Sequence, residues 1–227
     1  IRHGESESNV LRGVWSGPNW DAPMTPRGFE QASSLGKRLI SEGVIFDRIY
    51  SSSQTRAVQT TKTMLREMNQ CPDKFDQVDE IIEQQVPAWR GKRVEDVNTV
   101  EVLQQRSVGG KWFVPGDGKG ESERIVERRF SNWLEDHVIS TLQGQAARRW
   151  KIAIVSHGMA MQCLFHYILG YDDRYIGKIQ LDNASITRFK LGSRGWCLVS
   201  LNDSFHTLQL GDVNRDGISH NEERWGS

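Results

Sequence analysis

Hydrophobic residues recur at helical spacing in several stretches of the chain. Thr25-Pro26 opens the first stretch with a pair typical of helix starts, and Gly43 follows it as a residue typical of helix ends. One face of this predicted helix carries Phe29, Ala32, Leu35, Leu39 and Ile40. Similar patterns predict further helices over residues 54–68, 95–106, 122–142 and 158–169.

Short β-branched and apolar runs lie between the predicted helices. Residues 44–50 and 151–156 are typical of strands, and the second run is apolar enough for a parallel strand buried on both faces. The remaining segments are a strand and loop over residues 78–86, a glycine-rich loop over 109–120, and closing strands over 185–190 and 196–202. This alternation of strands and helices favours an α/β fold with a mostly parallel sheet.

Residues suited to phosphate chemistry follow three of the predicted strands. They are Arg2-His3-Gly4 at the start of the chain, residues 51–56, and Ser156-His157-Gly158. Because the carboxyl ends of parallel strands meet at one edge of a sheet, we expect Arg2, His3, Arg56 and His157 to converge there. A lone histidine or arginine more often has a structural role, but two of each predict a cationic pocket. Arginine is suited to bidentate binding of phosphate oxygens.

The overall composition excludes several classes of protein. The 227 residues include 29 basic and 29 acidic side chains, a neutral balance that argues against a general nucleic-acid binder. Eight Trp and eight Phe supply a folded core, and no apolar run is long enough to span a membrane. The odd number and wide spacing of Cys71, Cys163 and Cys197 predict reduced thiols in the cytoplasm. The chain opens directly on Ile1, so an upstream targeting segment would leave no trace in this sequence.

The order and content of the motifs resemble the histidine phosphatase superfamily, in its phosphoglycerate-mutase-like branch. The matching blocks are Arg2-His3-Gly4-Glu5-Ser6 with Asn9, Ser16-Gly17, Met24-Thr25-Pro26-Arg27-Gly28, residues 51–60, Glu83, Gly120-Glu121-Ser122, Val155-Ser156-His157-Gly158, Asn183-Ala184-Ser185, and Asn202-Asp203 with His206. The resemblance implies a three-layer α/β sandwich over residues 1–208, with its first strand truncated at the start.

The resemblance also implies a reaction through a phosphohistidine. His3 would be the nucleophile and Glu83 the acid and base, with Glu80 as the alternative carboxylate. The residues expected to bind the phosphoryl group are Arg2, Asn9, Arg56 and His157, and those expected to contact the rest of the substrate are Ser16, Gly17 and Arg90. Because arginine and histidine supply the positive charge, we expect no metal or other cofactor.

These residues predict metal-independent hydrolysis of a phosphate monoester of a small metabolite. One alternative is a phosphoglycerate mutase that depends on 2,3-bisphosphoglycerate, and another is a non-catalytic relative that binds proteins. Mutases of the family carry a longer insertion between the blocks at Glu83 and Glu121, so the short stretch here favours hydrolysis. A non-catalytic relative would be expected to lack one of the core residues, all of which are present. The sequence gives no indication of the oligomeric state.

The last residues, 209–227, form a separate predicted tail. Asp212, Asn214, Asp216 and Glu223 occupy positions 1, 3, 5 and 12 of a calcium-binding EF-hand loop, with Gly217 at position 6. Calcium binding is one interpretation, and a solvated polar tail is the other. The histidines that match no block are His137, His166 and His220, and we expect them to be structural or on the surface. His206, taken alone, would cap the last strand.

Overall fold

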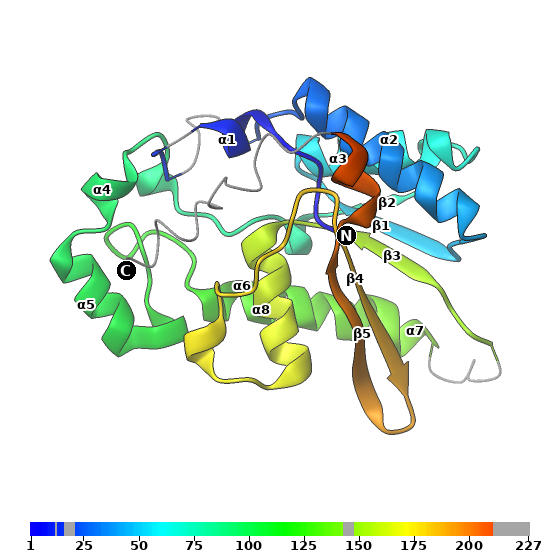
Figure 1. Ribbon diagram of the computed structural model, residues 1–227. Coiled ribbons are helices and arrows are strands. Elements are labelled where there is room, and N and C mark those ends of the chain that lie inside the picture. The colour runs from blue at the N-terminus through cyan, green and yellow to red at the C-terminus, as the bar shows by residue number, and fades with distance from the viewer. Residues whose placement is uncertain (12, 16–20, 143–147, 211–227) are drawn as a thin grey trace.

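A parallel sheet of three short strands lies at the centre of the protein (Figure 1). The computed structural model describes residues 1–11, 13–15, 21–142 and 148–210. The strand order is β2 (Asp76–Val78), β1 (Arg48–Ser52), β3 (Ile152–Val155). Tyr50 pairs with Asp76 on one side and with Ile154 on the other, and both pairings are parallel. The α/β fold with a parallel sheet is therefore confirmed.

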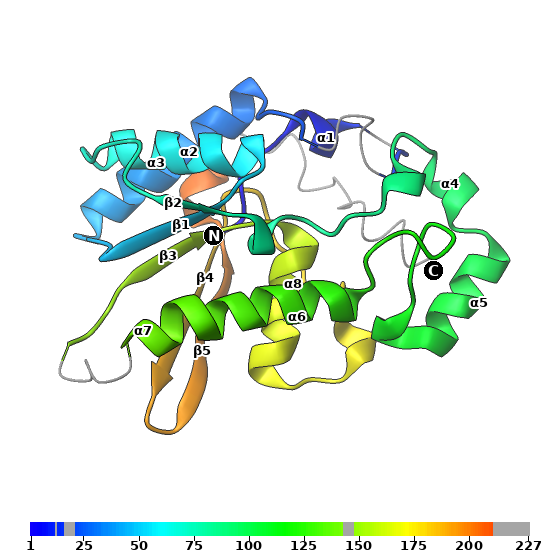
Figure 2. The same ribbon diagram turned by 180° about the vertical axis from the view of Figure 1, so that it is seen from behind.

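The start of the chain joins this sheet to a second, antiparallel pair of strands. Arg2 forms a parallel bridge with Ser156, and its backbone N–H donates to the Ser185 carbonyl at 3.1 Å. On the same side, the Ala184 N–H donates to the His3 carbonyl at 3.0 Å. The pair that follows is β4 (Ile186–Gly192) with β5 (Gly195–Asp203), and it extends away from the central sheet in both views (Figures 1 and 2).

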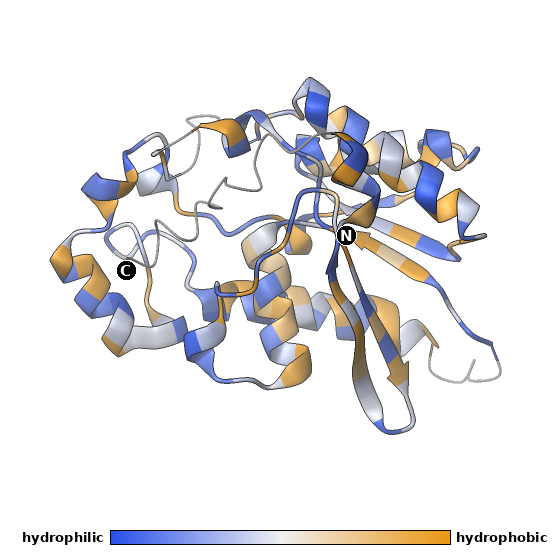
Figure 3. Ribbon diagram, viewed as in Figure 1, coloured by the Kyte–Doolittle hydropathy of each residue, from blue (hydrophilic) through white to orange (hydrophobic). Residues whose placement is uncertain are grey.

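Two layers of helices cover the two faces of the sheet (Figure 2). On one face lie α2 (Pro26–Ser41) and α3 (Thr55–Glu67), which bury a core that includes Leu35, Met64 and Ile49. On the other face lie α6 (Glu123–Trp133) and α8 (Gly158–Leu169), which pack around Phe130 and Tyr50. Figure 3 shows hydrophilic and hydrophobic residues alternating in bands along α2, as expected of a helix with one face in the core.

Shorter helices complete the described residues. They are α1 (Glu7–Val10), α4 (Val94–Val97), α5 (Val100–Gly109) and α7 (Ser140–Leu142), with a π-helical segment, Leu134–Ile139, between α6 and α7. Short 3₁₀ segments lie at Asp79–Ile81, Pro87–Trp89, Gly110–Trp112, Asp173–Tyr175 and Phe205–Leu210. Within the described ranges, no helix is both long and apolar enough to cross a membrane. Cys71, Cys163 and Cys197 are all free thiols.

Three predicted elements have different bounds in the structure. The predicted strand over residues 44–50 starts only at Arg48, because the Asp47 side chain is occupied in accepting the Lys151 N–H at 2.7 Å. The predicted strand over residues 78–86 ends at Val78, where the chain turns into a 3₁₀ segment. The predicted helix over residues 95–106 is divided into α4 and α5, because Thr99 caps a new helix there.

Gly36 is where α2 approaches α3 most closely, and it generates a test of the packing. A Cβ atom on Gly36 would lie 2.5 Å from the Met64 carbonyl oxygen and 2.6 Å from the Glu67 Cβ, both closer than atoms can pack. We expect Gly36→Ala to lower the free energy of unfolding by about 1–3 kcal/mol in urea denaturation. The control Lys37→Ala changes an exposed neighbour and should stay within about 0.5 kcal/mol. Equal stability of the two variants would contradict the close approach.

Candidate active site

The carboxyl ends of the strands bring the two predicted histidines together. The ring centroids of His3 and His157 lie 5.0 Å apart, and both rings are buried. Arg56, on the first turn of α3, is also buried, and its Nε donates to His3 Nε2 at 3.2 Å. The structure therefore joins residues that are far apart in the sequence, as the strand-end argument predicts.

The tautomer of His3 follows from its hydrogen bonds. Its Nδ1 lies 2.6 Å from the Gly4 carbonyl oxygen, which can only accept, so Nδ1 carries the proton. Its Nε2 faces the Arg56 guanidinium, which can only donate, so Nε2 presents a lone pair. A neutral imidazole with an unprotonated nitrogen is the form that can act as a nucleophile, once the donor that occupies its lone pair turns to a ligand.

Two buried nitrogen atoms in this group lack partners. His157 Nε2 lies 2.7 Å from Ser52 Oγ, while His157 Nδ1 has no hydrogen-bond partner among the described residues. The same holds for Arg2 Nε, although Arg2 Nη1 donates to the Leu181 carbonyl. Buried polar atoms without partners are uncommon, and at a site they indicate a place for a ligand atom. Two such atoms, one of them on an arginine, fit an anionic ligand.

Burial and positive charge shape the titration of the site. Burial first, and then repulsion from Arg56, hold the pKa of His3 well below its ordinary value of 6.5, and the same causes act on His157. Burial also lowers the pKa of Arg56 to about 10, against the attraction of Glu83. Both imidazoles are therefore neutral at neutral pH, while the arginines keep their charge. A phosphate dianion would relieve the repulsion between the buried cations.

Glu83 reaches the site from the loop after β2. Its Oε1 accepts the Ala160 N–H at 3.0 Å and its Oε2 accepts the Met159 N–H at 3.2 Å, both from the first turn of α8. The start of a helix stabilises negative charge, so this contact holds the Glu83 carboxylate in place. A Cβ on Gly158 would lie 3.8 Å from Arg2 Nε and 3.9 Å from Glu83 Oε2, so the side chains of Arg2 and Glu83 both lie close to this glycine.

Sequence reasoning missed two residues that position the site. The Gln54 Oε1 accepts the Glu83 backbone N–H at 2.8 Å and the Arg56 Nη2 at 3.3 Å, so one amide sets both groups. Asn183 donates from Nδ2 to the His3 carbonyl at 3.1 Å and to Asn9 Oδ1 at 3.2 Å. Gln54 and Asn183 both lie within the motif blocks. Their polar side chains, in blocks that also carry the charged site residues, were the signal available in the sequence.

The other predicted site residues have different outcomes. Asn9 lies near the His3 backbone through Asn183, and Arg90 donates from Nη2 to Gln85 Oε1 at 2.7 Å. The side chain of Glu80 makes no contact with the histidines in the hydrogen bonds of the described residues, whereas its carbonyl accepts from Arg129. Ser16, Gly17 and the calcium candidates Asp212, Asn214, Asp216 and Glu223 lie outside the described residues.

Comparison with known proteins agrees with this geometry. The match to the histidine phosphatase superfamily (branch 1) covers residues 1–204. The chain belongs to this superfamily. It is 28% identical to the broad-specificity phosphatase of Saccharomyces cerevisiae over 193 residues, covering 82% of this chain and 76% of that protein. It is 25% identical to the 2,3-bisphosphoglycerate-dependent phosphoglycerate mutase of Haemophilus influenzae over 223 residues, covering 86% of this chain and 94% of the mutase.

Among solved structures, a phosphoserine phosphatase has the same fold. The protein from Entamoeba histolytica, crystallised in complex with 3-phosphoglyceric acid, matches with a TM-score of 0.74 and 27% sequence identity. The match covers 91% of this chain and 96% of that one. The superfamily member described here therefore shares its core with both phosphatases and mutases.

The two neutral histidines predict how stability depends on pH. Their pKa values are lower in the folded protein than in the unfolded chain, so the unfolded chain binds more protons as the pH falls below about 6.5. Stability that is present above this pH should then be lost, by up to about 1.4 kcal/mol per pH unit for each residue. Urea unfolding at several pH values between 7.5 and 5 measures this loss.

His157→Gln removes one of the two titrating groups and serves as the comparison for this measurement. The variant should lose less stability than the wild type over the same pH interval. The same pH dependence in both proteins would show that His157 is not held neutral by the fold.

Proposed function

We propose that this protein hydrolyses phosphate monoesters of small metabolites through a phosphohistidine at His3. The observation that carries the proposal is the surroundings of His3 Nε2, which accepts from Arg56 and lies in a group with two buried nitrogen atoms that lack partners. These atoms are Arg2 Nε and His157 Nδ1. A phosphoryl oxygen that took over the Arg56 N–H would free the lone pair of Nε2. A phosphoryl group placed there would be held by charge on several sides while its phosphorus faces the nucleophile.

Two steps complete the reaction. In the first, His3 Nε2 forms a bond to phosphorus, the bond to the substrate oxygen breaks, and Glu83 supplies the proton that the leaving oxygen takes up. In the second, Glu83 takes a proton from water, the water oxygen bonds to phosphorus, and the bond to Nε2 breaks. Inorganic phosphate leaves, and His3 and Glu83 return to their initial states. The positive charge of Arg2 and Arg56 takes the place of a metal, and His157 contributes a neutral polar contact.

The position of Glu83 fits its proposed role. Its two carboxyl oxygens accept N–H groups from Met159, Ala160 and Gln84. These contacts fix the direction in which the carboxyl group faces the site, so the proton that it transfers would meet the leaving oxygen in a defined geometry.

The segment between Glu83 and Glu121 favours hydrolysis over phosphoryl transfer between two positions of a metabolite. This segment is short, and its helices α4 and α5 are joined through Trp89 and Val97 to a small apolar cluster with Trp15. A mutase must keep water away from its phosphohistidine, and a short cover excludes water less well than a long one. Arg90 is the candidate contact for a carboxylate of the substrate, such as those of phosphoserine or 3-phosphoglyceric acid.

The nucleophile can be tested directly. His3→Ala should lower the rate of phosphate release by at least about a thousandfold, since no other group replaces a covalent nucleophile. Brief reaction with ³²P-labelled substrate and quenching in alkali should trap acid-labile label on the wild type and none on the variant.

Incubation with 3-phosphoglycerate, with and without 2,3-bisphosphoglycerate, separates the phosphatase activity from the mutase activity. Rapid formation of 2-phosphoglycerate with little phosphate release would establish a mutase instead.

Glu83 is tested by the chemistry of the leaving group. Glu83→Gln should lower kcat/KM for alkyl phosphates by about 10²–10⁴-fold, because an alkoxide needs a proton to leave. The loss for p-nitrophenyl phosphate should be much smaller, because nitrophenolate leaves without one. Glu80→Gln is the matched control and should lower neither rate strongly. Equal losses for both substrates would assign Glu83 to positioning instead.

A further inference from the structure

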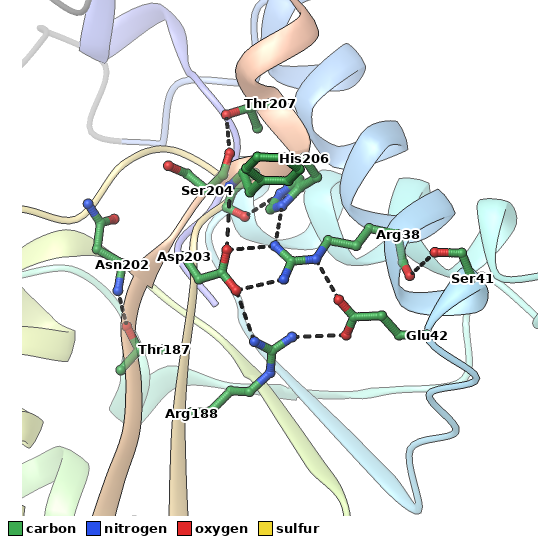
Figure 4. Close-up of polar contacts among 12 residues, drawn as sticks. Arg38, Ser41, Glu42, Thr187, Arg188, Asn202, Asp203, Ser204, His206 and Thr207 are labelled. Atoms are coloured by element: carbon green, nitrogen blue, oxygen red, sulfur yellow. Dashed lines mark hydrogen bonds and ion pairs between the residues drawn. The ribbon is translucent and has the colours of Figure 1, made fainter.

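A cluster of charged residues lies at the end of β5 (Figure 4). Arg38 of α2 donates from Nη1 and Nη2 to the two carboxylate oxygens of Asp203, at 2.7 and 2.6 Å, and from Nε to Glu42 at 2.7 Å. Arg188 of β4 bridges the same two carboxylates at 3.0 and 3.1 Å. Two arginines and two carboxylates thus join α2 to both strands of the antiparallel pair, β4 and β5.

His206 connects this cluster to the active site. Its Nδ1 lies 3.2 Å from Arg38 Nη1, which can only donate, so Nδ1 is an acceptor. The proton must then lie on Nε2, which donates to the Ala184 carbonyl at 3.0 Å. Arg38 therefore selects the tautomer of His206 that can hold Ala184.

Ala184 is in direct contact with the backbone of the nucleophile. Its N–H donates to the His3 carbonyl at 3.0 Å, beside the bond from Asn183 to the same oxygen. Ala184 has a φ of 58°, a left-handed conformation that a residue with a side chain adopts only where its surroundings hold it. The bond from His206 is one of the interactions that hold this peptide.

We propose that His206 is a positioning residue for His3, acting through Ala184, an inference that rests on the proposed function. His206 does not touch the substrate. His206 fixes the turn at Asn183 and Ala184, whose N–H groups hold the His3 carbonyl. The position of the His3 backbone in turn sets the direction of Nε2. Small displacements of a nucleophile have large effects on rate, so this contact should affect turnover more than substrate affinity.

The groups that face His206 make the contact dependent on pH. Arg38 and Glu42 approach from α2, Asp203 from β5 and the Ala184 carbonyl from the turn before β4, with Arg188 behind the carboxylates. Burial, and then Arg38, lower the pKa of His206 below its ordinary value of 6.5. Protonation at Nδ1 would place two cations face to face and break the contact with Arg38, so the contact exists in the neutral form.

Two substitutions at one position separate positioning from simple stability. In His206→Gln the side-chain amide can still donate to Ala184 and accept from Arg38, whereas in His206→Leu it can do neither. We expect His206→Leu to lower kcat by about tenfold or more with little change in KM, and His206→Gln to stay within about threefold of the wild type. Because glutamine does not titrate, the ratio of His206→Gln to wild-type activity should rise as the pH falls below 6.5. His137→Leu, at an exposed histidine on the π-helical segment, is the control and should change neither value.

The possible failures of this experiment are distinguishable. If the wild type releases no phosphate from any monoester, the proposed function is refuted. Hydrogen exchange of the Ala184 N–H then decides the inference. Exchange that is faster in His206→Leu but not in His206→Gln supports it, and equal exchange rates in both variants refute it. With an active wild type, a folded His206→Leu protein of unchanged kcat overturns the proposal. Where His206→Leu does not fold, the pH profile of His206→Gln decides, and a profile identical to the wild type overturns it.

Discussion

Two guanidinium groups buried beside two neutral imidazoles are the constraint on which the rest of this structure depends. Removing Arg2 and Arg56 from water is costly, and burial lowers the pKa of both. The fold tolerates this because Glu83 and Asp182 attract Arg2, and because the Leu181 carbonyl accepts one of its N–H groups. The proposed function makes use of this cost, since a bound anion would replace the water that the two guanidinium groups have lost.

The two helical layers contribute different parts of the site. Arg56 comes from α3 on one face of the sheet, and its backbone carbonyl accepts from Thr60, whose hydroxyl also accepts the Gly4 N–H. Glu83 is held by the start of α8 on the other face. Gln54 bonds to both Arg56 and Glu83, so it fixes one layer relative to the other. The sheet between them therefore sets the distance from His3 to Glu83.

The sequence predicted the convergence of the candidate site residues better than the contacts that support them. His3, His157 and both arginines follow strands, and the rule that the ends of parallel strands meet at one edge is general, so their convergence could be predicted. The contacts of His166 could not be predicted. Its ring lies between Glu127 at 2.6 Å and Asp173 at 2.9 Å, and these contacts join α8 to α6 and to the 3₁₀ segment that follows α8. The two carboxylates belong to separate segments, one on each side of α8 in the sequence, and no periodicity relates them to the histidine. Element ends were missed for a similar reason: Asp47 accepts the N–H of Lys151, which is distant in the sequence, and Thr99 caps a helix through one hydrogen bond from Val102.

The left-handed turn at Ala184 shows why such supports are distributed over the whole chain. An alanine in this conformation costs about 1–2 kcal/mol, more than one hydrogen bond contributes, so several contacts must share the task. They come from Asn183 beside it, from the start of the chain through His3, and from the last described helix through His206. The start and the end of the described chain thus meet at the two peptide groups of Ala184, next to His3. A site assembled in this way requires the complete sheet before it has its final geometry, so the proposed activity would depend on complete folding.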